Sequence, residues 1–453
     1  RLSQADSLTL DQFLDQVRKG NQAYRAQAQS SAGALERSGE GRLLLSPTLF
    51  ANVQLAEDAK LPTLPFFSYD SITANSYSLG LSQTTTFGLT ARVSYNAAYT
   101  NYNGGSFAGF RFHDAAPRIE LTQSLWANGF GAGTRASVEA AEAQALAQHF
   151  GQRFESRLSL AEAESAYWRL ATARQLVDVA ERTLKRAEKI AEWSSRRARL
   201  QLADRADALQ SQAALESSRL SFQSARDEAE VAARALNLAR GVDSSEVAEE
   251  LLALEPDQIE KIEAPRRVDA RDDVKAASEQ ARAASAAAES GLQRDQPTLD
   301  LFASYAMNGR AAGISDAFSD SWSSGRPTAA VGLRFQAPLA FGTASDARAG
   351  WRKEQIAAEE LHARRRFEEQ TGWKDLSTRL EQSRRRFALA REVERAQGRK
   401  VEAERSRLER GRSTTYQVLL FEQDYSQAQL ARIRAQSEVL ALVAQMKLYG
   451  DRS

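Results

Sequence analysis

The chain has no cysteine, and among its 453 residues it has only three histidines and two methionines. Without cysteine, disulfides, thiolate metal sites and Cys nucleophiles are excluded, and we expect no lipid anchor on an N-terminal cysteine. The three histidines, His113, His149 and His362, lie far apart in the sequence and offer little material for a metal or catalytic cluster. We therefore expect no bound metal, no cofactor and no enzymatic reaction.

An excess of one charge and a long apolar run are missing as well. The 60 basic and 59 acidic residues leave a formal net charge of +1, which argues against a nucleic-acid-binding protein. No run approaches the roughly 18 apolar residues of a transmembrane helix. Because the sequence starts at Arg1 without an apolar stretch, we expect that a signal peptide has already been removed. Transmembrane strands give a much weaker signal per segment and need a separate test.

Proline is absent from two long stretches of the chain. The nine prolines stand at positions 47, 62, 65, 117, 256, 265, 297, 327 and 338, so none lies between Pro117 and Pro256 or after Pro338. Proline breaks the interior of a helix, and these two gaps can therefore hold very long helices.

The proline-free stretches are rich in the strong helix formers Ala, Glu, Arg, Leu and Gln. Large residues recur every seven positions at 170, 177 and 184, beside an alanine column at 173, 180 and 187. This pattern is typical of closely packed, antiparallel coiled-coil helices. Polar segments at 196–210 and 405–419 interrupt the two stretches. We therefore predict one hairpin per stretch, made of two helices about 60 residues long, or roughly 90 Å each.

Several stretches near the prolines alternate apolar and polar residues. The clearest are Gly88–Thr100, Leu299–Tyr305 and Val331–Phe335, and each would place one apolar face on a half-buried strand. A soluble β-sandwich would give the same pattern as a barrel with lipid outside and water inside. The dense aromatic residues of this region favour the girdles of a membrane barrel; they are Phe50, Tyr77, Phe87, Tyr95, Tyr99, Tyr102, Phe107 and Phe110.

The same order of segments occurs twice. "SPTLFANVQLAED" at Ser46–Asp58 and "QPTLDLFASYAMN" at Gln296–Asn308 share Pro-Thr-Leu and an alternating run. A helical stretch leads into each of them, Leu10–Glu36 into the first and Arg271–Gln293 into the second. Helix, strand, loop, strand and long helical hairpin then follow in both halves, which indicates an internal duplication.

Five motifs extend this order over nearly the whole chain. They are the opening "LTLDQFLDQVRKGNQAYRAQAQS", the strand-to-helix passages "LTQSLWANGFGAGTRA" and "LRFQAPLAFGTASDARA", and the helix-tip repeats "RARLQLADRADALQSQAAL" and "RLERGRSTTYQVLLFEQDY". With them in this order, the chain resembles the TolC-type outer-membrane efflux family, the outer-membrane factors. The glycines of "GFGAG" lack the pattern of a phosphate loop and are expected to let the chain bend from strand into helix.

The resemblance implies an α+β membrane protein. Three copies would share one transmembrane β-barrel, continuous with a long periplasmic α-helical barrel of coiled-coil hairpins. Such a homotrimer is the passive exit duct of a tripartite efflux pump, including multidrug export, or of a type I secretion system. It would lie in the outer membrane of a Gram-negative bacterium, with a large periplasmic part. An adaptor would open its periplasmic tip, and an inner-membrane transporter would energise it. The sequence does not decide whether the cargo is a drug, a metal, a polysaccharide or a protein.

The expected organisation follows the duplication. It comprises N-terminal helices (1–46), strands (47–127), a long hairpin with its tip near 200–206 (128–240), an equatorial segment (241–266), a helix (267–296), strands (297–338) and a second long hairpin with its tip near 409–414 (339–453). One departure from the simplest family plan is an extra pair of strands at about 75–102. We expect this pair to join the barrel, giving about 18 strands in a trimer; the alternative is a hairpin folded over the outer mouth of a barrel of about 12 strands.

The resemblance also implies a gate at the tips. Asp207 matches the carboxylate that closes the family's entrance, while its partner arginine falls at Ser413, beside Arg412. The ring-forming aspartates fall at Gln417 and Leu420, neither of which is acidic, so no cation-blocking carboxylate ring is expected. Our hypothesis for the gate is Asp207, Arg412 and Gln417. The alternative is that these groups are solvated helix ends.

Adaptor docking is expected at the same tips. The candidate residues are Leu200, Leu202, Asp204, Arg205, Arg410, Gly411, Arg412 and Ser413. A solvated coiled-coil face is the alternative for this region. For the whole chain, the competing class is a periplasmic coiled-coil adaptor or structural protein with a soluble β-domain. An enzyme is a remote third, because no nucleophile–base set is visible.

Overall fold

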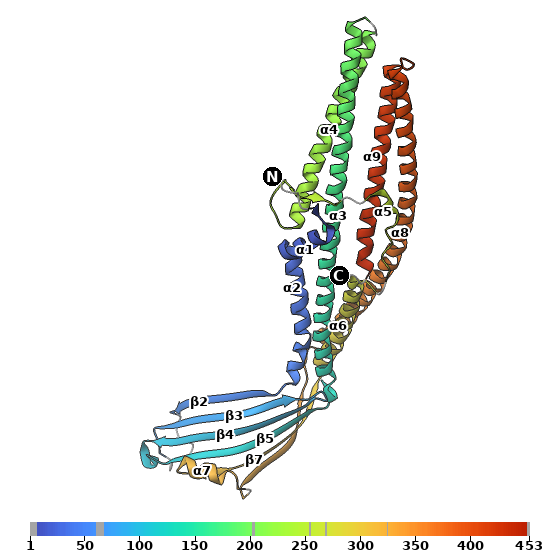
Figure 1. Cartoon of the computed structure of the whole chain (residues 1–453). Helices are drawn as coiled ribbons and strands as arrows, with labels where there is room; N and C mark the ends of the chain where they lie inside the picture. The colour runs from blue at the N-terminus through green and yellow to red at the C-terminus, as the bar shows by residue number, and fades with distance from the viewer. Residues whose placement is uncertain are drawn as a thin grey trace. The chain divides into compact units, whose positions relative to one another are not determined.

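The computed structural model describes residues 7–59, 68–201, 204–252, 255–267, 270–323 and 325–450. Helices and mainly antiparallel strands make up an α+β fold (Figure 1). The chain divides into two compact units, each built from separate stretches of sequence. We call residues 1–33, 148–276 and 364–453 the helical unit, and residues 34–147 and 277–363 the sheet unit.

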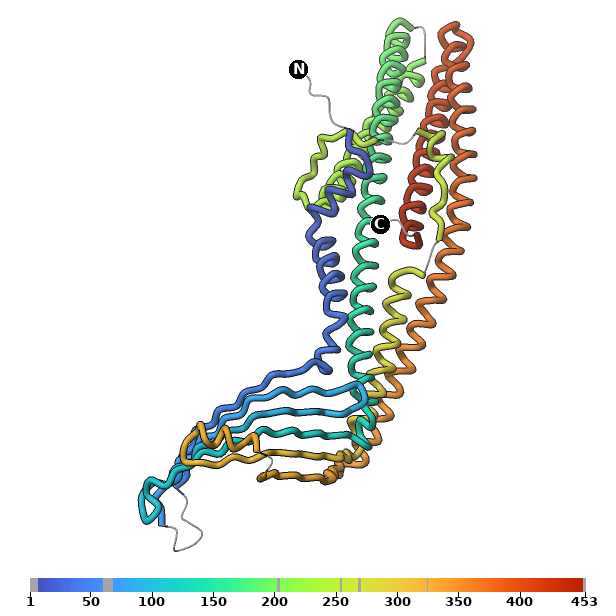
Figure 2. Tube along the Cα trace, turned by 60° about the horizontal axis from the view of Figure 1, so that its bottom comes forward, coloured from blue at the N-terminus to red at the C-terminus, as the bar shows by residue number. Residues whose placement is uncertain are grey.

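The sheet unit contains one large antiparallel sheet (Figure 2). Its six long strands are β2 (Thr48–Asp58), β3 (Ser71–Thr84), β4 (Leu89–Asn103), β5 (Arg111–Ser124), β7 (Thr298–Met307) and β9 (Pro327–Gln336), hydrogen-bonded in this order. The short strand β8 (Gly309–Ala311) also pairs with β5. The hairpin β3–β4 occupies the position of the predicted extra pair and lies within the sheet, between β2 and β5. Strands β2 and β9 form the two edges.

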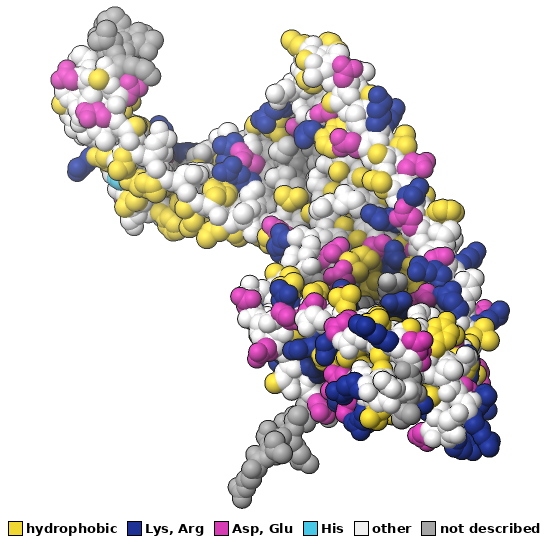
Figure 3. Space-filling model, turned by 90° about the horizontal axis from the view of Figure 1, so that it is seen from above, with side chains coloured by type: hydrophobic (Ala, Val, Ile, Leu, Met, Phe, Trp, Pro, Cys, Tyr) yellow, Lys and Arg dark blue, Asp and Glu magenta, His cyan; other side chains and the backbone are white. Residues whose placement is uncertain are grey.

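The two faces of the sheet differ sharply in character. One of them, the apolar face, carries large side chains that are mostly exposed: Leu49, Val53, Leu55, Tyr77, Leu79, Leu81, Val93, Ile119, Leu121, Leu301, Tyr305, Val331, Leu333 and Phe335. Figure 3 shows hydrophobic side chains gathered along this part of the molecule. The opposite, polar face carries residues such as Arg92, Ser94 and Glu120, because successive side chains of a strand alternate in direction.

On the polar face, an aromatic ring covers a glycine in each half of the duplication. Phe50 lies opposite Gly80, where an added Cβ would stand 2.6 Å from the ring, and the Arg92 guanidinium lies 4.0 Å from the ring centroid. Phe302 lies opposite Gly332 in the same way, with Arg334 stacked at 5.4 Å. Such a ring supplies packing that glycine lacks in a strand.

The passage from β5 into α3 (Ala132–Arg199) bends at the short 3₁₀ turn η3 (Gly129–Gly131). Gly131 has φ +78°, and an added Cβ would lie 2.2 Å from the Thr86 carbonyl oxygen. Gly88 approaches the same point from the β3–β4 turn. Glycine is thus required at residue 131 both by its backbone conformation and by the close approach of another strand.

Helices of unequal length form the two hairpins. The first consists of α3, with 68 residues, and α4 (Arg205–Ala239), with 35. The second consists of α8 (Phe341–Glu409), with 69 residues, and α9 (Thr415–Met446), with 32. The prediction of two equal helices of about 60 residues was therefore wrong. The left-handed Gly241, with φ +77°, follows the end of α4, and the 3₁₀ helix η4 (Lys447–Tyr449) follows α9.

Separate shorter helices precede each set of strands. The predicted helix at Leu10–Glu36 is two helices, α1 (Leu10–Gly20) and α2 (Gln22–Glu36), because Asn21 is extended and its side-chain Nδ2 donates to the Ala239 carbonyl (2.8 Å). The 3₁₀ helix η1 (Arg37–Leu45) follows α2, and α6 (Asp272–Arg294) leads into β7. No helix in the described ranges combines the length and hydrophobicity needed to cross a membrane.

The core of the helical unit forms around Tyr167. This fully buried side chain packs on Phe13 and Trp168, beside Leu170 and Leu236. Its hydroxyl donates to the Leu8 carbonyl (2.7 Å) and accepts from the Leu252 amide (3.1 Å). It thereby joins β1 (Ser7–Leu8) to the segment after β6 (Glu250–Leu251), its parallel partner. A second cluster joins α5 (Pro256–Glu260) to α8 and α9 through Ile259, Phe387 and Val439.

Candidate functional site at the hairpin tips

The first tip is the turn between α3 and α4. Helix α3 ends with three arginines in its last turn, at positions 196, 197 and 199. Asp204 caps α4 by accepting from the Ala206 amide (3.0 Å), as a short acidic side chain at this position commonly does. Leu200 and Arg205 are exposed. Leu202, a predicted docking residue, lies outside the described residues.

The second tip is the turn between α8 and α9. Gly411 has φ +67°, and the following Arg412 amide donates back to the Arg407 carbonyl (2.8 Å), which closes the end of α8. Thr414 caps α9 by accepting from the Gln417 amide (3.2 Å). The Ser413 hydroxyl donates to the buried Glu404 carboxylate. The Arg410 side chain donates to the hydroxyl of Ser406 at 2.7 Å.

The predicted gate residues all lie at these tips. Asp207 stands in the first turn of α4 and is partly exposed, Arg412 is exposed, and Gln417 is partly exposed at the start of α9. Within the described part of this one chain, no ion pair or hydrogen bond joins Asp207 to Arg412. A contact between them therefore stays a prediction for neighbouring copies.

A buried carboxylate links the two hairpins below their tips, and sequence reasoning missed it. Glu422 of α9 is only 6% exposed. Its Oε2 pairs with Arg186 Nε of α3 (2.9 Å), and its Oε1 accepts from Arg405 Nε of α8 (2.6 Å). The signal in the sequence is a lone acid after the apolar run "VLLF", since a charge on the buried side of a helix requires a partner.

The same region contains an elongated cavity of about 850 Å³ between α3, α4 and α9. Its walls include Val179, Ile190, Leu220 and Leu420, and Arg186 and Glu422 also line it. Serine and glutamine side chains, Glu228 and Arg434 line it too, so the wall of the cavity is mixed in character.

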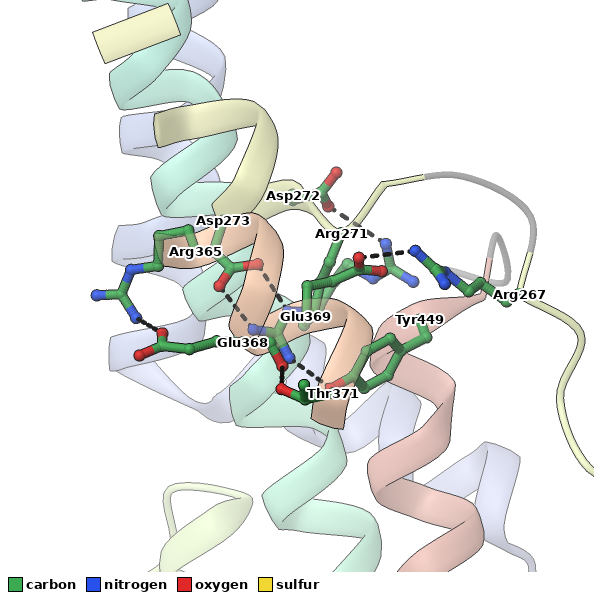
Figure 4. A network of polar contacts seen from close by, with 10 residues as sticks. Arg267, Arg271, Asp272, Asp273, Arg365, Glu368, Glu369, Thr371 and Tyr449 are labelled. Atoms are coloured by element: carbon green, nitrogen blue, oxygen red, sulfur yellow. Dashed lines mark hydrogen bonds and ion pairs between the residues drawn. The ribbon is translucent and has the colours of Figure 1, made fainter. Parts of the chain in front are cut away.

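A second polar network anchors the end of the chain (Figure 4). Arg271, just before α6, donates to Asp273 (2.6 Å) and to the Tyr449 hydroxyl (2.8 Å). Arg267 donates to the buried Glu369 of α8 (2.7 Å). Burial raises the pKa of Tyr449 above its ordinary value, so the hydroxyl keeps its proton. The network fixes helix ends; among the described residues, no group of His, Asp and Glu side chains is placed to hold a metal.

Comparison with known proteins identifies the fold. No protein-family model matches the sequence, and neither does any curated protein. Among solved structures, the outer-membrane channel OprN is 16% identical, with 97% of this chain and 89% of that chain covered and a TM-score of 0.67. VceC, an outer membrane protein of Vibrio cholerae, is 15% identical (97% and 96% covered, TM-score 0.66). The Campylobacter jejuni CmeC outer membrane channel is 14% identical (97% and 85% covered, TM-score 0.65).

The chain thus has the fold of outer-membrane channels. The resemblance to the TolC-type efflux family predicts this α+β fold, which is confirmed, whereas the trimer and its shared barrel stay predictions.

Proposed function

We propose that the chain is one protomer of a trimeric exit duct in the outer membrane of a Gram-negative bacterium. The observation that carries this proposal is the sheet, which has an exposed apolar face, a polar face and, among the described residues, two unpaired edge strands. Within lipid every backbone polar group needs a partner, so an open edge is not tolerated there. Edge β9 of one copy would pair with edge β2 of the next, and three copies would close a barrel of about 18 strands.

The aromatic residues at the helix end of the sheet support this placement. Trp126 and Phe335 lie together at the helix end of the strands, with ring centroids 6.4 Å apart. Tyr102, Phe107 and Phe110 form a second cluster at the opposite end. Phe335 stands on the apolar face, where an aromatic girdle of a membrane barrel would lie, whereas Tyr102 pairs with Ile72 and stands on the polar face. The polar face would then line the water-filled channel.

Exposed apolar stripes on the helical unit support the trimer. On α4, Leu209, Leu220 and Val231 are exposed and stand eleven residues apart. On α8, the exposed Phe367 and Leu389 stand twice that distance apart, with the exposed but polar Thr378 midway between them. A spacing of eleven residues keeps a stripe on one side of a nearly straight helix. We infer that these stripes pack between copies and close the periplasmic tube.

At the tips, we infer that a periplasmic adaptor docks on the exposed side chains of Leu200, Arg205, Arg410 and Arg412. The adaptor would open the tube, and an inner-membrane transporter would supply the energy, since the duct itself is passive. Contact of Asp207 with Arg412 or Gln417 of a neighbouring copy would hold the tip closed. The competing class, a periplasmic adaptor with a soluble β-domain, is disfavoured because such a domain would not leave so large an apolar face uncovered.

The test is the mass of the purified chain in detergent, together with its single-channel conductance in planar bilayers. We expect a trimer that opens rarely and with small conductance. A monomer that needs no detergent and conducts nothing would contradict the duct and favour the adaptor class.

The same recordings test the gate. Asp207→Arg should open more often than the wild type, because repulsion from Arg412 would replace attraction. Asp227→Arg, at an exposed aspartate farther along α4, is the matched control and should leave opening unchanged. Equal opening of all three proteins would remove Asp207 from the gate.

A further inference from the structure

The short helix α7 (Ile314–Asp320), which connects β8 to β9, lies on the apolar face of the sheet. It packs against β8 and β5, and Figures 1 and 2 show it lying across the strands. Tyr95 fixes the face, because it stands two residues from the exposed Val93 on β4 and so points the same way. Its hydroxyl lies 2.9 Å from Ser321 Oγ, and its ring centroid lies 5.4 Å from that of Phe318 and 6.1 Å from that of Trp322.

Small residues let the helix backbone touch the sheet. Ala317 and Ser321 are fully buried, and so nearly is Ala115 of β5 beneath them. Gly309 of β8 passes so close that an added Cβ would lie 2.1 Å from the Ala317 carbonyl oxygen. The position of α7 on the apolar face is therefore built into the packing of the sheet.

One flank of α7 carries a partly exposed apolar ridge. Ile314, Phe318 and Trp322 follow one another at four-residue spacing, which places them on one side of a helix, and they are 64%, 51% and 57% exposed. Asp316 and Asp320 are exposed on its flank. The helix therefore adds large apolar side chains to a surface that is already apolar instead of covering it with polar ones.

The strand order limits what can cover this ridge. Helix α7 lies over β4 and β5, which are the middle strands of the order β2-β3-β4-β5-β7-β9. A ring of copies joined at β2 and β9 would not bring a neighbour over the middle of the sheet, so the ridge is left to lipid. Strand β4 shows where the apolar band of this face ends on the outer side. Its residues on this face become polar at Asn101 and Asn103, just beyond Tyr99.

We propose that α7 is a lipid-binding element of the barrel wall. Its ridge of Ile314, Phe318 and Trp322 inserts among the acyl chains near the outer limit of the apolar band, and Asp316 and Asp320 face the headgroups. Amphipathic aromatic rings favour this boundary, and a short helix can lie in it because its backbone groups are internally paired. This proposal rests on the proposed membrane barrel.

The absence of cysteine makes single-site labelling straightforward. Phe318→Cys places an environment-sensitive NBD fluorophore on the ridge, and Ser319→Cys places it one residue around the helix as a matched control. Leu79→Cys reports on the apolar face of β3. The full chain is reconstituted in phospholipid vesicles with nitroxide labels on the acyl chains. We expect the labels at positions 318 and 79 to lose roughly half or more of their emission, and the label at 319 clearly less, because only apolar sites reach acyl depth.

The outcomes separate this proposal from the proposed function. Quenching at position 79 without quenching at 318 overturns the role of α7 and leaves the barrel intact. A label at 318 that is blue-shifted but unquenched means that protein covers the ridge, which also overturns it. If neither the label at 318 nor the label at 79 is quenched, both the role of α7 and the proposed membrane barrel are contradicted. Should Phe318→Cys fail to fold, Trp322→Phe is the second variant, because it keeps an aromatic ring against Tyr95. In vesicles of brominated lipids, which quench tryptophan fluorescence, this variant should lose part of the quenching seen with the wild type. The control Trp193→Phe should not lose it.

Discussion

At the residue scale, buried carboxylates join helices that lie far apart in the sequence. Glu164 of α3 forms an ion pair with Lys447 (2.6 Å), and Asp272 of α6 forms one with Arg157 of α3 (3.2 Å). Glu422 joins α9 to both α3 and α8. All three carboxylates are nearly inaccessible to water. A charge in such a place is tolerated only when it is paired, so each pair fixes which helices can be neighbours.

Glu422 allows a direct test of this role. Glu422→Gln leaves Arg186 and Arg405 without their counter-charge, and we expect it to destabilise the helical unit by about 1–3 kcal/mol. Glu216→Gln is the matched control, because Glu216 is exposed and its ion pair with Arg219 lies within α4. Thermal unfolding in detergent, followed by far-UV circular dichroism, measures both variants. Equal midpoints for the two would show that the link between the hairpins contributes no more than a surface ion pair.

At the element scale, the turns fix where strands and helices begin and end. The sharpest is η3, where Asn128, Phe130 and Gly131 all have positive φ and the chain passes from β5 into α3. Only residue 131 combines this conformation with backbone atoms of another turn at 2.2 Å. A side chain at this point would push the β3–β4 turn away from the start of the helix.

Gly131→Ala should therefore lower the stability of the sheet unit by about 1–3 kcal/mol, through backbone strain and steric overlap. Gly129→Ala, two residues away, meets nothing within 4 Å and should be nearly neutral. The thermal midpoint and the yield of folded protein in detergent are the measurements. If the thermal midpoints of Gly131→Ala and Gly129→Ala are equal, the turn shifts to accommodate the added side chain without loss of stability.

Local patterns predicted most of these elements. The alternation of apolar and polar residues predicted the strands, including the extra hairpin. The proline-free segments predicted the long helices and their tips. Both signals are local, because each depends on a few neighbouring residues. The break at Asn21 escaped prediction because it depends on Ala239, more than 200 positions away. Three other features escaped prediction because they depend on contacts between distant segments. They are the pairing of β1 with β6, the ion pairs of Glu422 and the packing of α7 on the sheet.

At the scale of the whole molecule, the duplication appears in the helices and is broken in the sheet. The long helices α3 and α8 have 68 and 69 residues, and α4 and α9 have 35 and 32. The sheet instead takes four long strands from the first half and two from the second. The stripes on α4 and α8 are exposed among the described residues, as assembly through both hairpins would require.

Leu389→Asp tests this assembly. A carboxylate in the stripe of α8 should weaken the trimer by about 2 kcal/mol or more per interface, because burying it loses the apolar contact. Ala388→Asp adds the same charge about 100° around the helix, at another exposed position, and should leave the trimer intact. Sedimentation velocity in detergent at several protein concentrations measures the fraction of monomer. A trimer equally stable in both variants would place the stripe elsewhere than at the interface.

The hairpin β3–β4 also bears on what could leave through such a duct. The diameter of a β-barrel grows with its number of strands, so a ring of three six-stranded sheets is wider than one of three four-stranded sheets. The added width would lie along the strands and not along the helices, since the hairpin adds no helix. Selection of cargo by size would then fall to the periplasmic end, and the outer membrane would hold an outlet wider than anything the tips admit.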